Sequence, residues 1–250
     1  MKICEVKNIR IGEGKPKICI PIVGRDNEDI IKQASSLENL SYDMIELRID
    51  FYQDIKKIEE VLSLLEKVRL IIQKPILLTY RSLREGGEVQ LDDEIYLSLI
   101  THVCESHLVD LIDIELMSGD VLVHQLVDIA HQNEIKVIMS NHDFEKTPDK
   151  EDMKQRIEKM EQCNADILKL AVMPQSYQDV MNLMNVTFDM SQKVNRPIVT
   201  MSMGDIGKIT RICGELTGSS ITFATAGKAS APGQIALEDM QLLLEAIHHD

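Results

Sequence analysis

The feature that most constrains the fold of this chain is a repeat of short apolar segments that alternate with longer amphipathic ones. The apolar segments have the length of β-strands and recur at intervals of roughly 25 to 30 residues, which is the spacing of strand–helix units. We expect strands over residues 17–23, 44–51, 75–80, 108–115, 136–142, 167–172, 197–201 and 221–225. Between them, apolar residues recur at helical spacing, and we expect helices over 27–40, 55–72, 92–106, 121–133, 150–164, 175–194, a short piece near 207–214, and 237–248.

About eight strand–helix units in a chain of this length are the count and size of a (β/α)8 barrel. The rival architecture is a doubly wound open sheet, which usually carries a Gly-x-Gly-x-x-Gly turn after its first strand, and that motif is absent. No linker or break in composition divides the chain. We therefore predict an α/β fold, a single-domain (β/α)8 TIM barrel over residues 1–250 with a short N-terminal extension.

The charge of the chain limits its partners. A net charge of −14 argues against a surface for nucleic acid or an anionic membrane, because both need clustered Lys and Arg, whereas a small anionic substrate needs only a few local arginines.

The five cysteines are scattered and never form a Cys-x-x-Cys spacing, so we expect neither disulfides nor a metal site. The first residues lack an apolar signal region and no apolar run reaches membrane-spanning length, so we expect a cytoplasmic protein.

Polar side chains share the inward face of several predicted strands. Successive side chains of a strand point to opposite faces, and the set that faces the helices of a barrel must be apolar. By this test the inward polar residues of the second to sixth strands are Glu46, Arg48, Asp50, Thr79, Arg81, Asp113, Glu115, Ser140, His142 and Lys169. Each alone fits a structural ion pair or a solvated strand end. Buried charges are costly unless they pair, so together they indicate one shared site near the C-terminal ends of the strands.

One lysine stands within the apolar run 165–174. Lys169 has two explanations: a strand end whose ammonium reaches water, or an amine activated by desolvation and nearby cations that attacks a carbonyl to form a Schiff base. Strand alternation favours the second explanation, because it places Lys169 on the same inward face as His142 of the adjacent strand.

Several segments together resemble the type I 3-dehydroquinate dehydratases. They are Glu46-Leu47-Arg48-Ile49-Asp50, Thr79-Tyr80-Arg81-Ser82-Leu83-Arg84-Glu85-Gly86-Gly87, Ile138-Met139-Ser140-Asn141-His142-Asp143-Phe144, Lys169-Leu170-Ala171-Val172-Met173-Pro174, Met201-Ser202-Met203-Gly204, Arg211, and Ala229-Ser230-Ala231-Pro232-Gly233-Gln234. The resemblance implies a (β/α)8 barrel that dehydrates 3-dehydroquinate to 3-dehydroshikimate, a step of the shikimate pathway to aromatic amino acids. It implies no metal, no organic cofactor, and a homodimer.

The resemblance also implies roles for individual residues. Lys169 would form the imine with the C3 ketone, and His142, whose ordinary pKa of about 6.5 suits both directions near neutrality, would be the general acid–base. Glu85 would orient this histidine. The substrate-binding residues would be Glu46, Arg48, Arg81, Arg211, Ser230 and Gln234, with Arg211 at the substrate carboxylate. The run 225–233, small and flexible, would close over the site as a lid.

Three positions depart from the pattern of the family. Pro21 stands where many relatives have serine, Leu47 replaces a common tryptophan, and Leu168 replaces a common proline. The two leucines fall on the helix-facing set, so we expect only Pro21 to affect substrate contacts.

Two other functions fit the same chain. One is a class I Schiff-base aldolase-like lyase, for which Gly204 and Gly207 offer a weak phosphate site near the last strands. The other is a non-catalytic barrel that binds a polyhydroxy acid, which would have no need of an amine and a histidine poised together.

Overall fold

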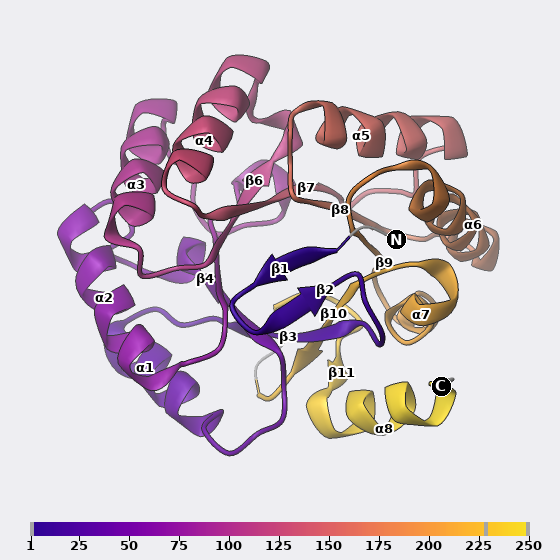
Figure 1. Ribbon diagram of the computed structural model, residues 1–250, viewed down its shortest axis with the longest axis horizontal. Coiled ribbons are helices and arrows are strands. Elements are labelled where there is room, and N and C mark those ends of the chain that lie inside the picture. Colours follow the sequence, from indigo (N-terminus) through magenta and orange to yellow (C-terminus); the bar gives the residue numbers. More distant parts are fainter. Residues whose placement is uncertain (1–2, 228–229, 249–250) are drawn as a thin grey trace.

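Eight parallel strands form the wall of the barrel in the computed structural model, which describes residues 3–227 and 230–248 (Figure 1). In ring order they are β3 (Lys17–Ile22), β4 (Met44–Arg48), β5 (Ile76–Thr79), β6 (Leu111–Glu115), β7 (Lys136–Asp143), β8 (Ile167–Val172), β9 (Ile198–Ser202) and β10 (Ile221–Thr225). Strand β10 pairs with β3, and the Ser220 N–H donates to the Ile198 carbonyl oxygen at 2.7 Å, so β10 also meets β9. The ring is therefore closed. A short strand, β11 (Ile235–Ala236), pairs with β10.

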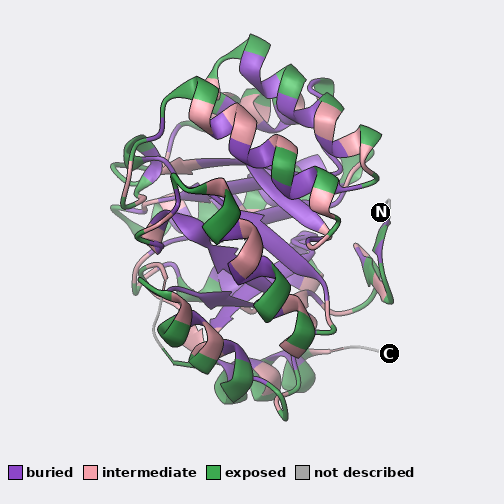
Figure 2. Cartoon of the chain, turned by 90° about the vertical axis from the view of Figure 1, so that its left-hand side faces the viewer, coloured by how far each residue is buried: buried purple, intermediate pink, exposed green. Residues whose placement is uncertain are grey.

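A helix follows each of these strands on the outside of the ring. The helices are α1 (Asn27–Ser36), α2 (Ile58–Ile71), α3 (Asp93–Ser106), α4 (Asp120–Gln132), α5 (Lys150–Gln162), α6 (Tyr177–Lys193), α7 (Gly214–Thr217) and α8 (Leu237–Ile247). Side chains of Asp26, Asp149 and Ser176 accept backbone N–H groups at the starts of α1, α5 and α6, which satisfies donors that the first turn leaves free. Figure 2 shows buried strands inside and exposed outer helix faces.

Two apolar cores flank the barrel wall. The outward-facing strand residues, Leu47 among them, pack against the helices, as strand alternation predicted. The inward-facing residues of the N-terminal half, such as Leu77, form the second core. A hairpin of β1 (Cys4–Val6) and β2 (Ile9–Ile11) lies over this end of the barrel, with Ile11 fully buried (Figures 1 and 2). Because this end is closed by apolar side chains, the polar inward residues gather at the opposite end.

The predicted (β/α)8 architecture is confirmed, although two strands are three residues shorter than expected. The strand expected over 44–51 ends at Arg48, where a 3₁₀ turn begins, and the strand expected over 108–115 begins at Leu111. Arg69 of α2 donates to the Leu108 carbonyl oxygen, just ahead of β6, at 2.9 Å, so this carbonyl bonds to a side chain. Apolar content alone cannot reveal such side-chain contacts to the backbone.

All five cysteines are buried free thiols. In the ranges 3–227 and 230–248, no helix combines the length and the apolar character needed to cross a membrane.

Candidate active site

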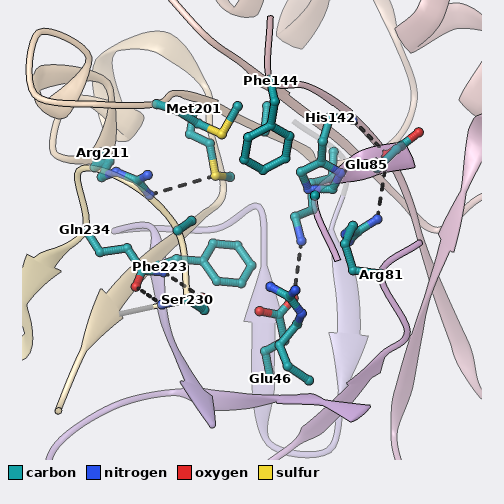
Figure 3. Close-up of a pocket in the computed structure, with 16 residues that line it drawn as sticks. Glu46, Arg81, Glu85, His142, Phe144, Met201, Arg211, Phe223, Ser230 and Gln234 are labelled. Atoms are coloured by element: carbon teal, nitrogen blue, oxygen red, sulfur yellow. Dashed lines mark hydrogen bonds and ion pairs between the residues drawn. The ribbon is translucent and has the colours of Figure 1, made fainter. Parts of the chain in front are cut away.

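All nine site residues predicted from the sequence line one cavity at the C-terminal ends of the strands (Figure 3). They are Glu46, Arg48, Arg81, Glu85, His142, Lys169, Arg211, Ser230 and Gln234. Strands β4, β7 and β8 and the segment after β5 supply the first six, and the segments after β9 and β10 supply the last three. The inward convergence predicted from strand alternation is present.

Lys169 lies at the floor of the cavity and is only 3% exposed, so the explanation of a lysine that reaches bulk water is wrong. Its Nζ donates to Asp113 Oδ2 at 3.2 Å and to Glu46 Oε1 at 3.4 Å. It also lies 4.6 Å from the centroid of the Phe223 ring, within the range of a cation–π contact. We expected cations beside this amine, but its direct ionic partners are two carboxylates.

His142 is held by Glu85 at the wall of the cavity. Its Nδ1 lies 3.0 Å from Glu85 Oε2, and the same oxygen accepts the backbone N–H of His142 at 2.9 Å. Asn141 Nδ2 donates to the other Glu85 oxygen at 3.1 Å. An ionised Glu85 carboxylate can only accept hydrogen bonds, so in that state the imidazole proton lies on Nδ1, which leaves Nε2 as the free base.

The pKa values of His142 and Glu85 both differ from those of ordinary side chains. Burial, reinforced by Arg81 and Lys169, lowers the pKa of His142 well below 6.5. Burial and the nearby Glu115 raise the pKa of Glu85 to about 7. The imidazole is therefore neutral at physiological pH and ready to accept a proton.

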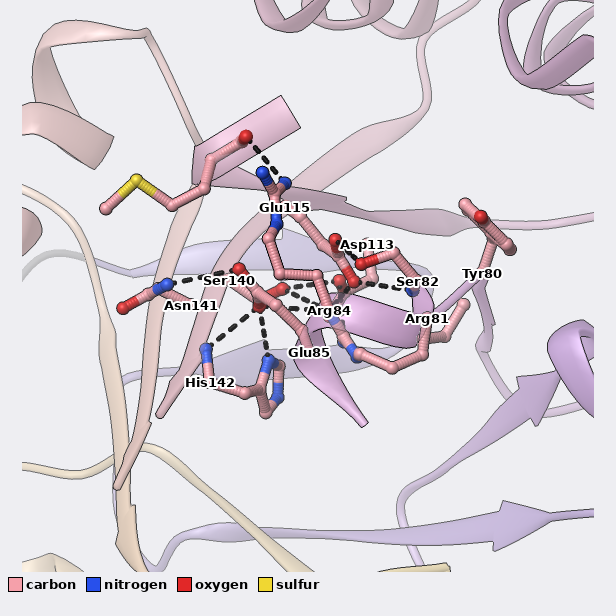
Figure 4. A network of polar contacts seen from close by, with 12 residues as sticks. Tyr80, Arg81, Ser82, Arg84, Glu85, Asp113, Glu115, Ser140, Asn141 and His142 are labelled. Atoms are coloured by element: carbon pink, nitrogen blue, oxygen red, sulfur yellow. Dashed lines mark hydrogen bonds and ion pairs between the residues drawn. The ribbon is translucent and has the colours of Figure 1, made fainter. Parts of the chain in front are cut away.

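Arg81 is the centre of a buried ionic network behind the cavity (Figure 4). Its guanidinium donates to Asp113 at 2.8 Å, to Glu115 at 3.0 Å and to the Ser140 hydroxyl at 2.9 Å. Burial alone would lower the pKa of Arg81, but the carboxylates of Asp113 and Glu115 outweigh it and raise the pKa. Glu115 also accepts from the backbone N–H and hydroxyl of Ser82, so the segment that carries Arg81 is fixed to β6.

Two further predicted residues lie on β4. Glu46 Oε1 accepts from the Thr79 hydroxyl at 2.9 Å, and Arg48 forms two parallel hydrogen bonds, both 2.8 Å long, with the Asp50 carboxylate. Such a fork holds the guanidinium in one orientation. Pro21, the departure expected to affect substrate contacts, pairs in register with Glu46 but is absent from the lining of the described cavity.

Arg211 is the guanidinium with the fewest charged neighbours in the described cavity. It is 3% exposed, its Nε has no hydrogen-bond partner in the described structure, and its other contacts are the Pro232 carbonyl oxygen at 3.0 Å and the Met201 sulfur at 3.9 Å. Burial lowers the pKa of Arg211 to about 10. A cation buried without an anion is costly, and an anionic group beside it would reduce that cost.

The segment after β10 forms the rim beside Arg211. Gln234 Oε1 accepts the backbone N–H of Ser230 at 2.9 Å, and Gln234 Nε2 donates to the Ser230 hydroxyl at 3.1 Å. Lys228 and Ala229, which belong to the predicted lid, lie outside the described residues.

Five residues around the site had no role predicted from sequence: Asp113, Phe144, Met201, Met203 and Phe223. Strand alternation had placed Asp113 on the inward face, but its partners depend on the register of three strands. The Phe144 ring stacks beside His142 with 6.5 Å between ring centroids. Aromatic and methionine side chains carry no sequence signal that separates a site from a core. In the described part of the chain, no group of three His, Cys, Asp or Glu side chains is arranged to hold a metal ion.

The fold and the cavity together define a class of protein. A closed (β/α)8 barrel with an amine, an imidazole and guanidinium groups at the C-terminal ends of its strands is the arrangement of a barrel enzyme with a small-molecule substrate. The family model for type I 3-dehydroquinase matches residues 18–250. The chain belongs to the type I 3-dehydroquinase family.

Relatives match the chain over almost its whole length. It is 46% identical over 246 residues to the 3-dehydroquinate dehydratase of Clostridioides difficile (strain 630), covering 98% of this chain and 96% of that protein. It is 47% identical over 251 residues to that of Clostridium botulinum (strain Eklund 17B / Type B), covering 100% and 99%. Among solved structures, it is similar to the type I 3-dehydroquinate dehydratase from Clostridium difficile with covalently modified comenic acid, at a TM-score of 0.97, 45% identity and 99% coverage of both chains.

Proposed function

We propose that this protein dehydrates 3-dehydroquinate to 3-dehydroshikimate through an imine formed by Lys169. The observation that carries the proposal is a buried primary amine and a buried imidazole of lowered pKa in the same cavity. Membership of the type I 3-dehydroquinase family, together with relatives named 3-dehydroquinate dehydratase, supports the choice of substrate.

The first step is attack of Lys169 Nζ on the C3 ketone. A carbon–nitrogen double bond forms and the ketone oxygen leaves as water. The protonated imine withdraws electrons from C2, so the C2 proton becomes acidic. The amine sits on the rigid wall of β8 with all six strand residues buried, which supports a fixed position for the nitrogen during this step.

His142 is the proposed acid–base for the elimination. Its Nε2 takes the C2 proton, the C1–C2 double bond forms, and the departing C1 hydroxyl receives a proton from His142 to leave as water. Hydrolysis of the imine then releases the product and restores the amine. The contact between Glu85 and Nδ1 supports this role, because it fixes the tautomer in which Nε2 is free.

The remaining residues are proposed to hold the substrate. Arg211 is buried with no carboxylate partner in the described structure, and this supports it as the site for the substrate carboxylate. The polar groups of Glu46, Arg48, Arg81, Ser230 and Gln234 line the same cavity and suit a substrate with several hydroxyl groups. The reaction would be a step of the shikimate pathway, and we expect a homodimer, which light scattering would test.

The aldolase-like alternative is weaker. It requires a phosphate site near Gly204 and Gly207, yet a Cβ added at Gly207 would lie 2.2 Å from the Ser202 carbonyl oxygen. That glycine is explained by close backbone packing rather than by space for a phosphate. A binding protein without catalysis would not need a neutral imidazole beside a buried amine.

The test follows the conjugated enone of 3-dehydroshikimate by its ultraviolet absorbance after 3-dehydroquinate is added. The wild type and Arg25→Met, a substitution at an exposed position, are expected to form the enone at equal rates. Lys169→Met is expected to form none above the uncatalysed rate. Absence of enone with the wild type, or its formation by Lys169→Met, would show that the proposal is wrong.

A further inference from the structure

Asp113 is a carboxylate on β6 at the junction of three functional side chains. It is completely buried, and its Oδ1 accepts from Arg81 at 2.8 Å and from the Ser140 hydroxyl at 2.6 Å. Its Oδ2 accepts from Lys169 Nζ at 3.2 Å. Side chains from the segment after β5 and from β7 therefore fix one carboxylate oxygen, and the other oxygen is left for the amine on β8.

The amine lies between two carboxylates with different surroundings. Glu46 lines the cavity, whereas Asp113 lies behind the amine and takes no part in the described lining. Glu46 is therefore accessible to a bound substrate, and Asp113 is shielded from it by Lys169.

Imine formation reduces the number of hydrogen bonds that the nitrogen can donate. An ammonium group and a ketone give a protonated imine and one water, so the positive charge at nitrogen is kept while its N–H groups fall from three to one. One N–H cannot serve both Glu46 and Asp113 well. The carboxylate that keeps it must stay on the side of the nitrogen away from the substrate carbon.

We propose that Asp113 is the fixed counter-ion of the protonated imine. Glu46 instead loses its hydrogen bond from the amine and accepts one from a hydroxyl group of the substrate. The proposal rests on the proposed function, since it assumes the imine at Lys169. Asp113 contacts the reacting nitrogen and would therefore be a catalytic residue that neither the sequence motifs nor the cavity lining assigns.

The surroundings of Asp113 support a permanent negative charge. Burial acts to raise its pKa, but the nearby Arg81 and Lys169 outweigh burial and hold the pKa below its usual range. The other charged or titratable groups near Lys169 are Glu46, at 3.4 Å, His142, whose own pKa Lys169 helps to lower, and the buried thiol of Cys19. An ionised carboxylate is the strongest acceptor for the imine proton, and of the two carboxylates that contact Lys169, Asp113 is the one outside the cavity lining.

The imine must remain protonated to withdraw electrons from C2. A counter-ion within contact distance shifts proton binding by about 1 to 3 pH units. The basic limb of the pH profile of kcat, where kcat falls as the pH rises, reports ionisations of the enzyme–substrate complex. Loss of the counter-ion should therefore shift this limb, whereas ordinary loss of packing should not.

The test compares Asp113→Asn with Asp110→Asn. The second substitution is a matched control, because it also removes a carboxylate and lies directly ahead of the same strand, β6. Asp110 binds Arg69 and the backbone N–H of Ile76, away from the cavity. We expect the basic limb of kcat to move to lower pH by about 1 to 3 units in Asp113→Asn and to stay in place in Asp110→Asn. Borohydride would trap an imine in both variants at about pH 6. An unmoved limb in folded Asp113→Asn would overturn the inference.

Glu46→Gln supplies a second, independent outcome if Asp113→Asn does not fold by circular dichroism. We expect it to raise KM and to leave the basic limb of kcat in place. A shift of that limb in Glu46→Gln as large as 1 unit would assign the counter-ion to Glu46 and overturn the inference for Asp113. A wild type that yields no trapped adduct would instead refute the proposed function, so the two failures are distinguishable.

Discussion

Arg211 offers a prediction in which stability and activity change in opposite directions. Burial lowers the pKa of its guanidinium well below the ordinary arginine value, to about 10. At neutral pH the side chain is charged in both the folded and the unfolded state, so the folded state bears the whole cost of burying it. At about 1.4 kcal/mol for each pH unit, that cost is about 3 kcal/mol. The hydrogen bond to the Pro232 carbonyl oxygen offsets about 1 kcal/mol of it.

Arg211→Met should therefore stabilise the protein when no substrate is bound. We expect the free energy of unfolding in urea to rise by about 2 kcal/mol, which corresponds to a melting temperature about 4 to 8 °C higher for a chain of this size. The same variant loses the proposed partner of the substrate carboxylate, so we expect KM to rise about 100-fold. Arg25→Met, an exposed position, is the matched control and should change neither quantity.

Product binding distinguishes this explanation from a general effect on packing. The product, 3-dehydroshikimate, carries the same carboxylate and should raise the melting temperature of the wild type by mass action, but not that of Arg211→Met. If Arg211→Met unfolds at lower urea than the wild type and still responds to product, Arg211 is not an uncompensated cation that waits for an anion.

Three further substitutions test the site and its support. His142→Ala should abolish turnover yet leave an imine that borohydride can trap; normal turnover would rule out its acid–base role. Glu85 has a pKa of about 7 in the folded state against 4.5 in an ordinary carboxyl group, so folding binds its proton and stability falls as pH rises between these values. Relative to the wild type, Glu85→Gln should gain up to about 3 kcal/mol of unfolding free energy between pH 4.5 and pH 8, measured in urea; an equal pH dependence of the two proteins would contradict this. Gly87→Ala would place a Cβ 1.9 Å from a backbone carbonyl oxygen and should cost about 3 kcal/mol in the loop that carries Glu85. Gly227→Ala, whose Cβ meets no atom of the described residues within 4 Å, should cost far less in the same unfolding assay, and equal losses would show that the contact at Gly87 is relieved.

Periodicity, the count of about eight strand–helix units and the absence of a glycine-rich nucleotide turn were together enough to predict the barrel. Strand alternation also placed Lys169 and His142 on the inward face, since the two-residue period of a strand holds wherever the strand is regular. Strand alternation could not predict a role for Arg211 or Ser230, because both lie in segments after strands. Only the resemblance to a family indicated them. Nor could strand alternation reveal the contacts of Asp113, which depend on how three strands are staggered.

The charge state of the site also could not be predicted from the sequence. An ordinary pKa was expected for His142, whereas burial together with three neighbouring cations, Arg81, Lys169 and Arg48, lowers it. Cations were expected beside Lys169, whereas two carboxylates contact it. Both differences arise from distances between residues far apart in the chain, because electrostatic effects of this size need contact within a few ångströms and exclusion of water.

The most direct test of the proposed chemistry is chemical trapping of the imine. The wild-type protein is incubated with 3-dehydroquinate and borohydride, digested, and analysed by mass spectrometry of the peptides. We predict a stable mass increase on the peptide that contains Lys169, at that residue, and none when borohydride is added without substrate. A protein that produces the enone while Lys169 remains unmodified, or while another lysine carries the adduct, would contradict the imine at Lys169.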